Sequence, residues 1–217
     1  MNSKNTSLSR YFQRSEPLVL TAELVLPDGA PLQEGGDEAL ILVRRREGER
    51  LFPLLEQELM ALRGRAILSI DCRNIAIMDI SFADECFGKL TRRRIAKEYP
   101  DRYFVLERVG EELKANLQSL CNSREIVLVQ YATEASFDVP PDILGGLGAE
   151  MKETYLQACE QGRITARSLI ERVGEHRLSI AACSNRLKRL TELGLLAAVE
   201  EEIIEGGGRQ KVFAPVR

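Results

Sequence analysis

The stretch SIAACSNRLKRLTELGLL, residues 179–196, decides the fold of the last third of the chain. Its apolar residues recur at helical spacing as far as Gly194. This pattern predicts one amphipathic helix that ends near the glycine and continues as a strand. At 100° per residue, four side chains gather on one side of the helix and predict its core-facing stripe. These four are Ile180, Cys183, Leu187 and Leu190.

The opposite side of this helix carries small and polar groups together with cations. Ser179 stands where its hydroxyl can cap the helix, and a helix N-terminus also favours phosphate. Asn can bond bidentately to adenine, Arg and Lys can reach guanine or phosphate, and Ser can take either role. Two interpretations stay open, a helix that reads DNA and an ordinary surface helix. The predicted outward residues are Ala181, Ser184, Asn185, Lys188, Arg189 and Glu192.

The segments around this helix give it a context. Three helices followed by a β-hairpin are the winged-helix layout, a helix-turn-helix with a hairpin wing. Residues 150–217 are therefore predicted to form a winged-helix domain. Arg209, Gln210 and Lys211 are expected at a flexible hairpin tip, from which cations reach backbone phosphate or the minor groove. The other predicted elements are helices at 150–162 and 165–174 and strands at 195–205 and 211–217.

The segments CSNRLKRLTELGLL (183–196) and GGGRQKVFAPV (206–216) resemble the recognition helix, turn and wing of bacterial winged-helix regulators of the MarR and ArsR type. On the helical wheel Arg186 lies on the flank, which favours phosphate over base contact. Such domains also serve as protein–protein modules, so a protein target is the alternative. Metal-sensing members carry clustered ligands, whereas Cys183 and His176 stand alone here, so no metal is expected. The residues that the resemblance places at or near DNA are Ser184, Asn185, Arg186 and Lys188.

The preceding two thirds of the chain alternate strands with helices, which predicts an α/β fold with a mostly parallel sheet. The apolar run AILSIDC at 66–72 is typical of a central strand covered on both faces. We expect a polar leader at 1–16, the α/β domain at 17–135 and a Pro- and Gly-rich linker at 136–149. Predicted strands lie at 17–26, 39–46, 66–72, 103–109 and 125–131, and predicted helices at 51–64, 81–99 and 110–121.

Composition excludes several classes of protein. The hydrophobic share of 44% and the charged share of 29% are ordinary for a soluble globular protein, and no apolar run reaches the ~20 residues of a membrane span. The N-terminus has no apolar signal region. Five scattered cysteines predict reduced thiols in the core of a cytoplasmic protein. A net charge of −3 argues against indiscriminate coating of nucleic acid, so any DNA contact needs a local basic face.

The segment DCRNIAIMDISFADECFGKL (71–90) resembles the STAS fold of sulfate transporters and anti-sigma factor antagonists. It is more similar to the STAS-like domains of unknown function that are often joined to helix-turn-helix modules, and the resemblance covers roughly 38–131. It implies a protein partner at this domain. It also matches Ser81 to the phosphorylatable serine at the N-terminus of a helix in the antagonists. From the residues alone, Ser81 equally suits a helix N-cap.

Charged side chains in this region offer no catalytic constellation. Asp84 and Glu85 are adjacent and point in different directions on a helix, and the chain lacks a catalytic His, a nucleophile motif and a phosphate loop. The basic runs at 44–47 and 91–94 are expected to be solvated, with contact to DNA or an acidic partner as the alternative. The acidic residues expected to be helix caps and solvated charges are Asp71, Asp79, Asp84 and Glu85.

The sequence therefore predicts a cytoplasmic bacterial transcription regulator. A STAS-like α/β domain would sense a signal or bind a partner, and a winged helix would bind double-stranded DNA. We expect a homodimer, because one winged helix has a small footprint and half-sites pair. No cofactor, metal or catalysis is expected. The alternatives are a protein–protein adaptor in a partner-switching pathway and an enzyme component with a site in the α/β domain, for which the sequence offers no residues.

Overall fold

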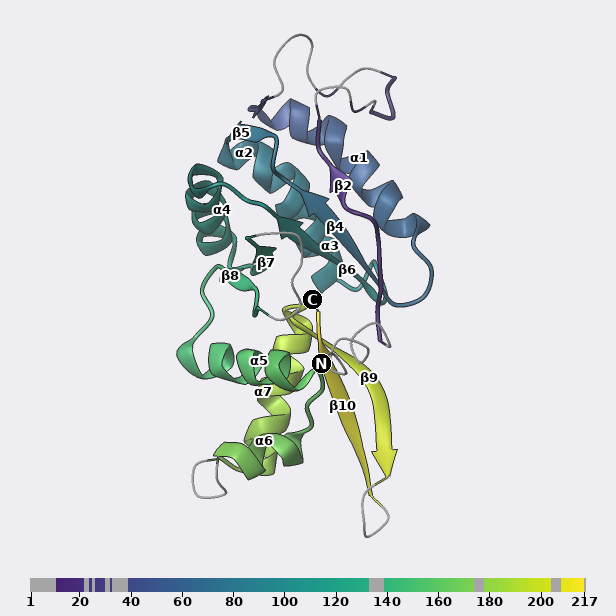
Figure 1. Cartoon of the computed structure of the whole chain (residues 1–217), viewed down its shortest axis with the longest axis vertical. Coiled ribbons are helices and arrows are strands. Elements are labelled where there is room, and N and C mark those ends of the chain that lie inside the picture. The colour runs from purple at the N-terminus through teal and green to yellow at the C-terminus, as the bar shows by residue number, and fades with distance from the viewer. Residues whose placement is uncertain are drawn as a thin grey trace, which may run out of the picture. The chain divides into compact units, whose positions relative to one another are not determined.

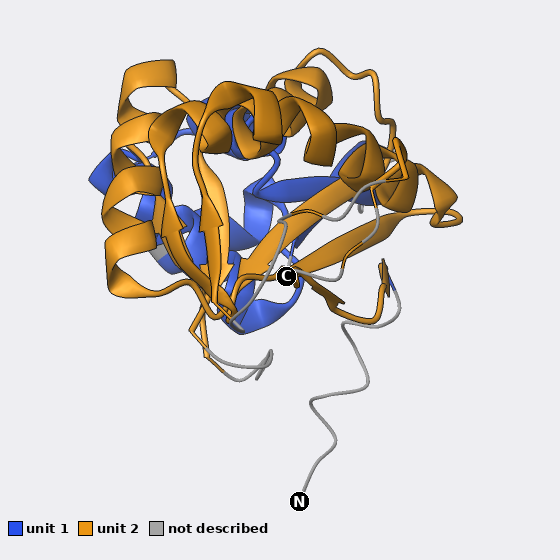
Figure 2. Ribbon diagram, turned by 90° about the horizontal axis from the view of Figure 1, so that it is seen from above, with its two compact units in different colours: residues 1–11, 147–216 blue, residues 12–146, 217 orange. Residues whose placement is uncertain are grey.

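A computed structural model describes residues 11–21, 24, 26–29, 32, 39–132, 139–173, 178–203 and 208–216 (Figure 1). The chain divides into two compact units, which Figure 2 colours separately. The α/β unit comprises Phe12–Gly146, and the helix–hairpin unit comprises Leu147–Val216 together with Tyr11. In the described parts of the chain, no helix is long and apolar enough to cross a membrane.

The α/β unit is built on a six-stranded sheet in the order β1-β4-β6-β7-β8, with β2 also pairing with β4. Neighbouring strands run parallel, except for the antiparallel pair of β7 and β8. The prediction of an α/β fold with a mostly parallel, mixed sheet is confirmed at this level. The strands are β1 (Gln13–Arg14), β2 (Leu18–Val19), β4 (Ala66–Asp71), β6 (Arg102–Glu107), β7 (Leu128–Tyr131) and β8 (Asp142–Leu144).

The helices of this unit share one core with one face of the sheet. Side chains alternate along a strand, and Leu68 and Ile70 of β4 lie in the same buried cluster as Phe52, Phe87 and Leu117 of the helices. One helical run is continuous but changes its winding in the middle, where a π-helical segment lies. The elements are α1 (Arg45–Ala61), α2 (Ile80–Ala83), the π-helix η1 (Asp84–Gly88), α3 (Lys89–Ile95) and α4 (Glu111–Arg124).

A separate two-stranded parallel sheet joins β3 (Leu40–Leu42) to β5 (Ile75–Met78). The strand predicted at 39–46 is too long, because Arg45 already begins α1. β5 is absent from the predicted elements. Its two central residues, Ala76 and Ile77, are both exposed between two buried ends, so the strand lacks the alternation that marks a half-buried strand.

Two predictions near the N-terminus are wrong. The leader predicted at 1–16 contributes β1 to the sheet, and the backbone amides of Gln13 and Ser15 donate to carbonyls at the edge of β4 at 2.9 and 3.0 Å. The strand predicted at 17–26 shrinks to β2, and residues 22, 23 and 25 lie outside the described residues. The sheet therefore takes its edge from a polar segment whose composition gave no sign of a strand.

The linker predicted at 136–149 contains β8, which extends the sheet beyond β7. Gly145 ends this strand with a φ of 109°, and a Cβ atom there would lie 2.4 Å from the backbone oxygen of Ile126. Glycine is thus required for a close turn beside the end of the sheet. The prolines and glycines in this stretch therefore belong to an edge strand and to the turn that follows it, and not to an extended linker. The boundary between the two compact units lies after Gly146.

Among its described residues, the helix–hairpin unit contains three helices and two antiparallel strands that form a hairpin. The short bridge between Ile164 and Phe213 pairs the segment between α5 and α6 with the hairpin. Tyr155 is fully buried, and its hydroxyl donates to the backbone oxygen of Val216 at 3.3 Å, which ties the first helix to the last residues. The elements are α5 (Ala149–Gln161), α6 (Ala166–Val173), α7 (Ile180–Glu192), β9 (Leu196–Ile203) and β10 (Arg209–Pro215).

Candidate functional site

The helix α7 is fixed at both of its ends. At its start, the Ser179 hydroxyl accepts a hydrogen bond from the backbone N–H of Ala182 at 3.2 Å, which confirms the predicted cap. At its end, Gly194 adopts a φ of 73°, and the N–H of Leu195 donates to the carbonyl of Leu190 at 2.9 Å. The helix therefore presents its outward side chains from a rigid frame.

The core stripe of α7 is confirmed for three of its four predicted members. Cys183, Leu187 and Leu190 are fully buried. The prediction for Ile180 is wrong, since this side chain is 55% exposed. Ser179 and Ala181 are exposed as well, Ala182 is partly buried, and full burial begins only at Cys183. The exposed isoleucine thus belongs to the outward surface.

The outward side of α7 carries the expected polar residues. Ser184, Asn185 and Lys188 are exposed, and among the described residues their side chains have no hydrogen-bond or ion-pair partner. Arg189 is also exposed but pairs with Glu192 at 3.3 Å. Arg186 is only 18% exposed and forms an ion pair with Glu150 of α5, so its charge is already engaged within the unit.

The hairpin differs from the prediction. Arg209, Gln210 and Lys211 lie within β10 and not at the tip, because they pair in register with Ile203, Glu202 and Glu201 of β9. Arg209 faces Glu201 at 3.7 Å, and the Gln210 amide donates to Glu202 at 3.3 Å. The predicted tip residues 204–207 lie outside the described residues.

A cleft of about 500 Å³ lies beside the start of α6 in the same unit. The start of α6 is closed by a reciprocal pair, because Thr165 and Ser168 each accept a hydrogen bond from the other's backbone N–H, at 3.1 and 2.9 Å. Two arginines line the cleft. Arg167 is exposed, and Arg163 forms an ion pair with Glu202 of the hairpin. The surface that lines the cleft is about equally polar and apolar, and its described residues include no catalytic grouping.

In the α/β unit, Ser81 is not the helix cap. Asp79 takes that position, since its carboxylate accepts bonds from the N–H of Phe82 and of Arg44, both at 2.7 Å. The Ser81 hydroxyl donates to the same carboxylate at 2.8 Å. Burial raises the pKa of Asp79, but these hydrogen bonds outweigh it and hold that pKa below its ordinary value. A phosphate on Ser81 would therefore meet an ionised neighbour.

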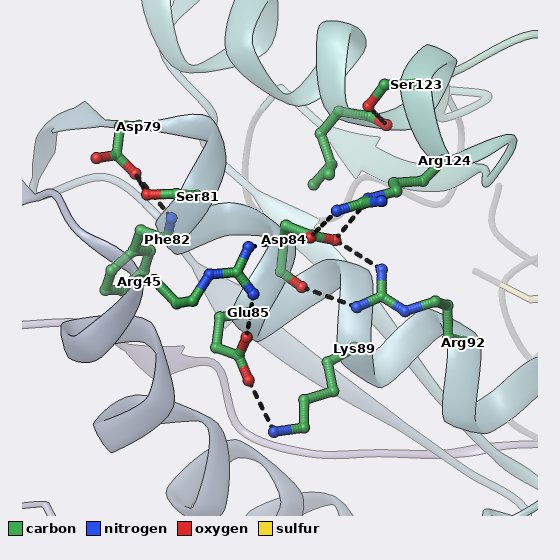
Figure 3. A network of polar contacts seen from close by, with 11 residues as sticks. Arg45, Asp79, Ser81, Phe82, Asp84, Glu85, Lys89, Arg92, Ser123 and Arg124 are labelled. Carbon is green, nitrogen blue, oxygen red and sulfur yellow. Dashed lines mark hydrogen bonds and ion pairs between the residues drawn. The ribbon is translucent and has the colours of Figure 1, made fainter.

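Asp84 and Glu85 are buried and ion-paired, so the prediction of solvated charges is wrong. Figure 3 shows Asp84 between Arg92 and Arg124, whose closest nitrogens lie 2.6 and 2.5 Å from its oxygens. Burial raises the pKa of Asp84, but the bonds from the two guanidinium groups outweigh it and lower that pKa. Glu85 pairs with Lys89 at 2.8 Å and with Arg45 at 3.2 Å.

A further buried carboxylate, Asp71, lies at the carboxyl end of β4. Arg73 and Arg108 both donate to it, with Nε–O distances of 2.6 and 2.9 Å. Burial raises the pKa of Asp71, but the bonds from Arg108 and Arg73 dominate and lower it to about 2. On the neighbouring strand, Glu107 accepts from Arg14 at 2.6 Å. The expectation of a solvated Asp71 is therefore also wrong.

The sequence pattern misses these buried ion pairs because their partners are far apart in the sequence. Asp84 meets Arg124 across 40 residues, and Asp71 meets Arg108 across 37. The signal that could have found them is the placement of acidic residues in otherwise apolar surroundings, because a buried carboxylate needs a cation nearby.

Among the described residues, no group of three or more His, Cys, Asp or Glu side chains could hold a metal ion. No family model, curated protein or solved structure significantly matches the chain.

Proposed function

We propose that the chain is a DNA-binding transcription regulator whose helix–hairpin unit is a winged-helix domain. In this proposal α7 is the recognition helix and enters the major groove of double-stranded DNA, as the second helix of a helix-turn-helix does. The α/β unit is a STAS-like domain that receives a signal or a partner. One observation carries the proposal: α7 holds Ser184, Asn185 and Lys188 outward with no partner among the described residues.

The arrangement of groups on α7 supports sequence readout. An Asn amide matches the donor and acceptor edge of adenine, and apolar groups match the thymine methyl. Asn185 supplies the amide, and the exposed Ile180 and Ala181 supply apolar surface in the first turn. Because Ser179 caps the helix and the hydrophobic stripe is buried, these groups reach a groove without rearrangement. The proposed preference is for a site that contains an A·T pair.

The charges of this unit favour specific over indiscriminate binding. Residues 147–216 carry ten Lys or Arg and ten Asp or Glu, so the unit has no net positive charge. Arg186, Arg189 and Arg209 are each paired with a carboxylate. Non-specific affinity for DNA rises with the number of phosphates that free cations neutralise. We therefore expect weak binding to random DNA and dependence on a second copy, since half-site pairing doubles the contacts.

Selection of genomic DNA fragments by the full-length protein tests this proposal. We expect an enriched motif. The affinity for it should fall as the salt concentration rises, because the protein's cations release counterions from the DNA and this release becomes less favourable at higher salt. Changing Asn185 and Lys188 together to Ala should abolish the preference for that motif while the protein remains folded. Lys152→Ala is the matched control, because Lys152 is an exposed lysine on α5 and lies outside α7. Wild-type protein that enriches no motif would overturn the proposal.

A protein–protein adaptor is the second candidate, and the hairpin favours it. At the end of β9 the side chain of Ile203 is 80% exposed, and Glu201 and Glu202 engage the cations Arg209 and Arg163 in ion pairs. An exposed apolar side chain on a hairpin whose arginine is already paired with a carboxylate suits a protein surface better than a groove of DNA. Failure to select DNA, combined with loss of a co-purifying protein in Ile203→Ser, would favour the adaptor.

A further inference from the structure

The charges around Asp84 are arranged in layers, with the carboxylates beneath and the cations outside. The side chain of Asp84 is 4% exposed, whereas those of Arg45, Arg92 and Arg124 are 54%, 44% and 48% exposed. The three guanidinium groups come from α1, α3 and α4, which are far apart in the sequence. Figure 3 shows Arg92 and Arg124 meeting at Asp84, and Arg45 beside Asp84 with its closer contact to Glu85. A surface helix with scattered charges would not give this convergence.

The layer of cations exceeds the carboxylates that hold it. Arg45, Lys89, Arg92 and Arg124 surround two acids, Asp84 and Glu85. The cluster therefore keeps an excess of two positive charges. Each guanidinium has five N–H donors. The bonds to the two acids engage only some of these donors, and the half-exposed side chains leave the rest toward solvent.

The carboxylates also fix the positions of the cations in advance. Arg124 donates to both oxygens of Asp84, at 3.2 and 2.5 Å, and Arg92 donates to Oδ1 at 2.6 Å and to the Asp84 backbone oxygen at 3.5 Å. A ligand that meets held arginines loses less side-chain entropy on binding than one that must order them. Gly88 makes room for this arrangement, because a Cβ atom there would lie 2.6 Å from Asp84 Oδ1.

The surrounding charge decides what kind of anion fits. Residues 12–146 carry 17 Lys or Arg and 23 Asp or Glu, so the cluster is a small positive area on a negative unit. A long polyanion such as duplex DNA would be repelled along most of its length. A compact ligand with about two negative charges, such as a phosphate monoester at neutral pH, matches the excess and presents oxygens that accept in the fork geometry of arginine.

We infer that Arg45, Arg92 and Arg124 form a binding site for a phosphate monoester, carried either by a phosphorylated side chain of a partner protein or by a small phosphorylated molecule. The site lies in the α/β unit and does not depend on DNA binding by the helix–hairpin unit. Arg45 would be the adjustable member. It lies 3.9 Å from Asp84 and 3.2 Å from Glu85 and is the most exposed of the three arginines, so it would exchange its contact with Glu85 for one with the ligand.

Titration of the full-length protein with short peptides tests the site. The probes are Gly-Gly-phosphoSer-Gly-Gly, its unphosphorylated form and free O-phosphoserine, with binding followed by NMR signals of the arginine side chains. We expect saturable binding only of the phosphorylated probes. Loss of one charge-assisted contact should weaken binding about tenfold in Arg45→Gln and in Arg124→Gln. Arg45→Gln leaves the Arg92 and Arg124 pairs on Asp84 intact, so the variant should remain folded.

Arg63→Gln is the control, because Arg63 is an exposed arginine outside the cluster. Tighter binding of the phosphopeptide than of O-phosphoserine would assign the site to a protein partner, and equal affinities would assign it to a small molecule. The inference is overturned if phosphorylated and unphosphorylated peptides behave alike, or if Arg63→Gln weakens binding as much as Arg45→Gln. It is also overturned if Arg45→Gln lowers affinity for duplex DNA instead. Loss of DNA selection alone, as in the Asn185 variant, would leave it standing.

Discussion

Replacing Asp71 by Asn should remove a measurable part of the stability of the α/β unit. The change keeps the shape of the side chain, deletes its charge and replaces one acceptor oxygen by an NH2 donor. Asp71 is fully buried and accepts bonds from Arg73 and Arg108. These bonds lower its pKa from 3.8 to about 2, despite burial, which acts in the opposite direction. At 1.36 kcal/mol for each pKa unit, the ionised form contributes about 2.5 kcal/mol at neutral pH.

The sign of the pH dependence follows from the lowered pKa. The unfolded chain binds a proton at Asp71 near pH 4, whereas the folded protein does so only near pH 2. The stabilisation is therefore complete above about pH 5 and is lost as the pH falls from 4 toward 2. The free energy of unfolding of wild type should exceed that of Asp71→Asn by about 2.5 kcal/mol at pH 7, and the difference should shrink toward zero near pH 2.

The measurement is urea unfolding followed by amide NMR signals of β4, so that only the α/β unit is observed. Asp101→Asn is the control, because its carboxylate is 53% exposed and pairs with Arg65 at the surface, where a single ion pair contributes at most about 1 kcal/mol. A difference between wild type and Asp71→Asn that stays constant from pH 7 to pH 2 would refute the reasoning. So would equal losses in the two variants.

Two further substitutions test the packing of each unit. Gly88→Ala should destabilise the α/β unit by about 1–3 kcal/mol, since the new methyl would overlap the Asp84 carboxylate. Gly146→Ala is the control and should change the stability toward urea little, because the space around Gly146 is open. Equal effects of the two substitutions would contradict the close contact at Gly88. Ser179→Ala should lower the stability of the helix–hairpin unit by about 1 kcal/mol, because it removes the cap of α7, and Ser179→Asp should restore that stability. An unchanged thermal midpoint in the Ala variant would count against the capping bond.

Elements with a strong local period were predictable from the sequence. α5 and α6 begin and end within one residue of their predicted positions, because their apolar residues and flanking glycines are local signals. β4 was equally clear, since a strand that is buried throughout reads as one apolar run. By contrast β5 and β8 escaped detection. Each is short. β5 is held by pairing with β3, which lies before α1 and β4 in the sequence, and β8 lies in a stretch whose prolines and glycines hide its pairing with β7.

The candidate sites divide in the same way. The outward side chains of α7 follow from helical geometry, so Ser184, Asn185 and Lys188 were placed correctly on the exposed side. The first turn was misjudged at Ile180, because a helical wheel does not show where the neighbouring helices stop. The arginines around Asp84 could not be foreseen, since nothing local brings α1, α3 and α4 to one carboxylate.

The π-helical turn Asp84–Gly88 sets the angular phase between the two ends of its helix. Each residue in an α-helix advances the direction of the side chain by about 100°, and a π-turn accommodates one extra residue without breaking the helix. The end capped by Asp79 and the end that carries Arg92 are thereby offset by one residue. A chain with the same number of residues but regular α winding through this turn would rotate Arg92, which lies eight residues after Asp84, to a direction about 80° around the helix axis from it.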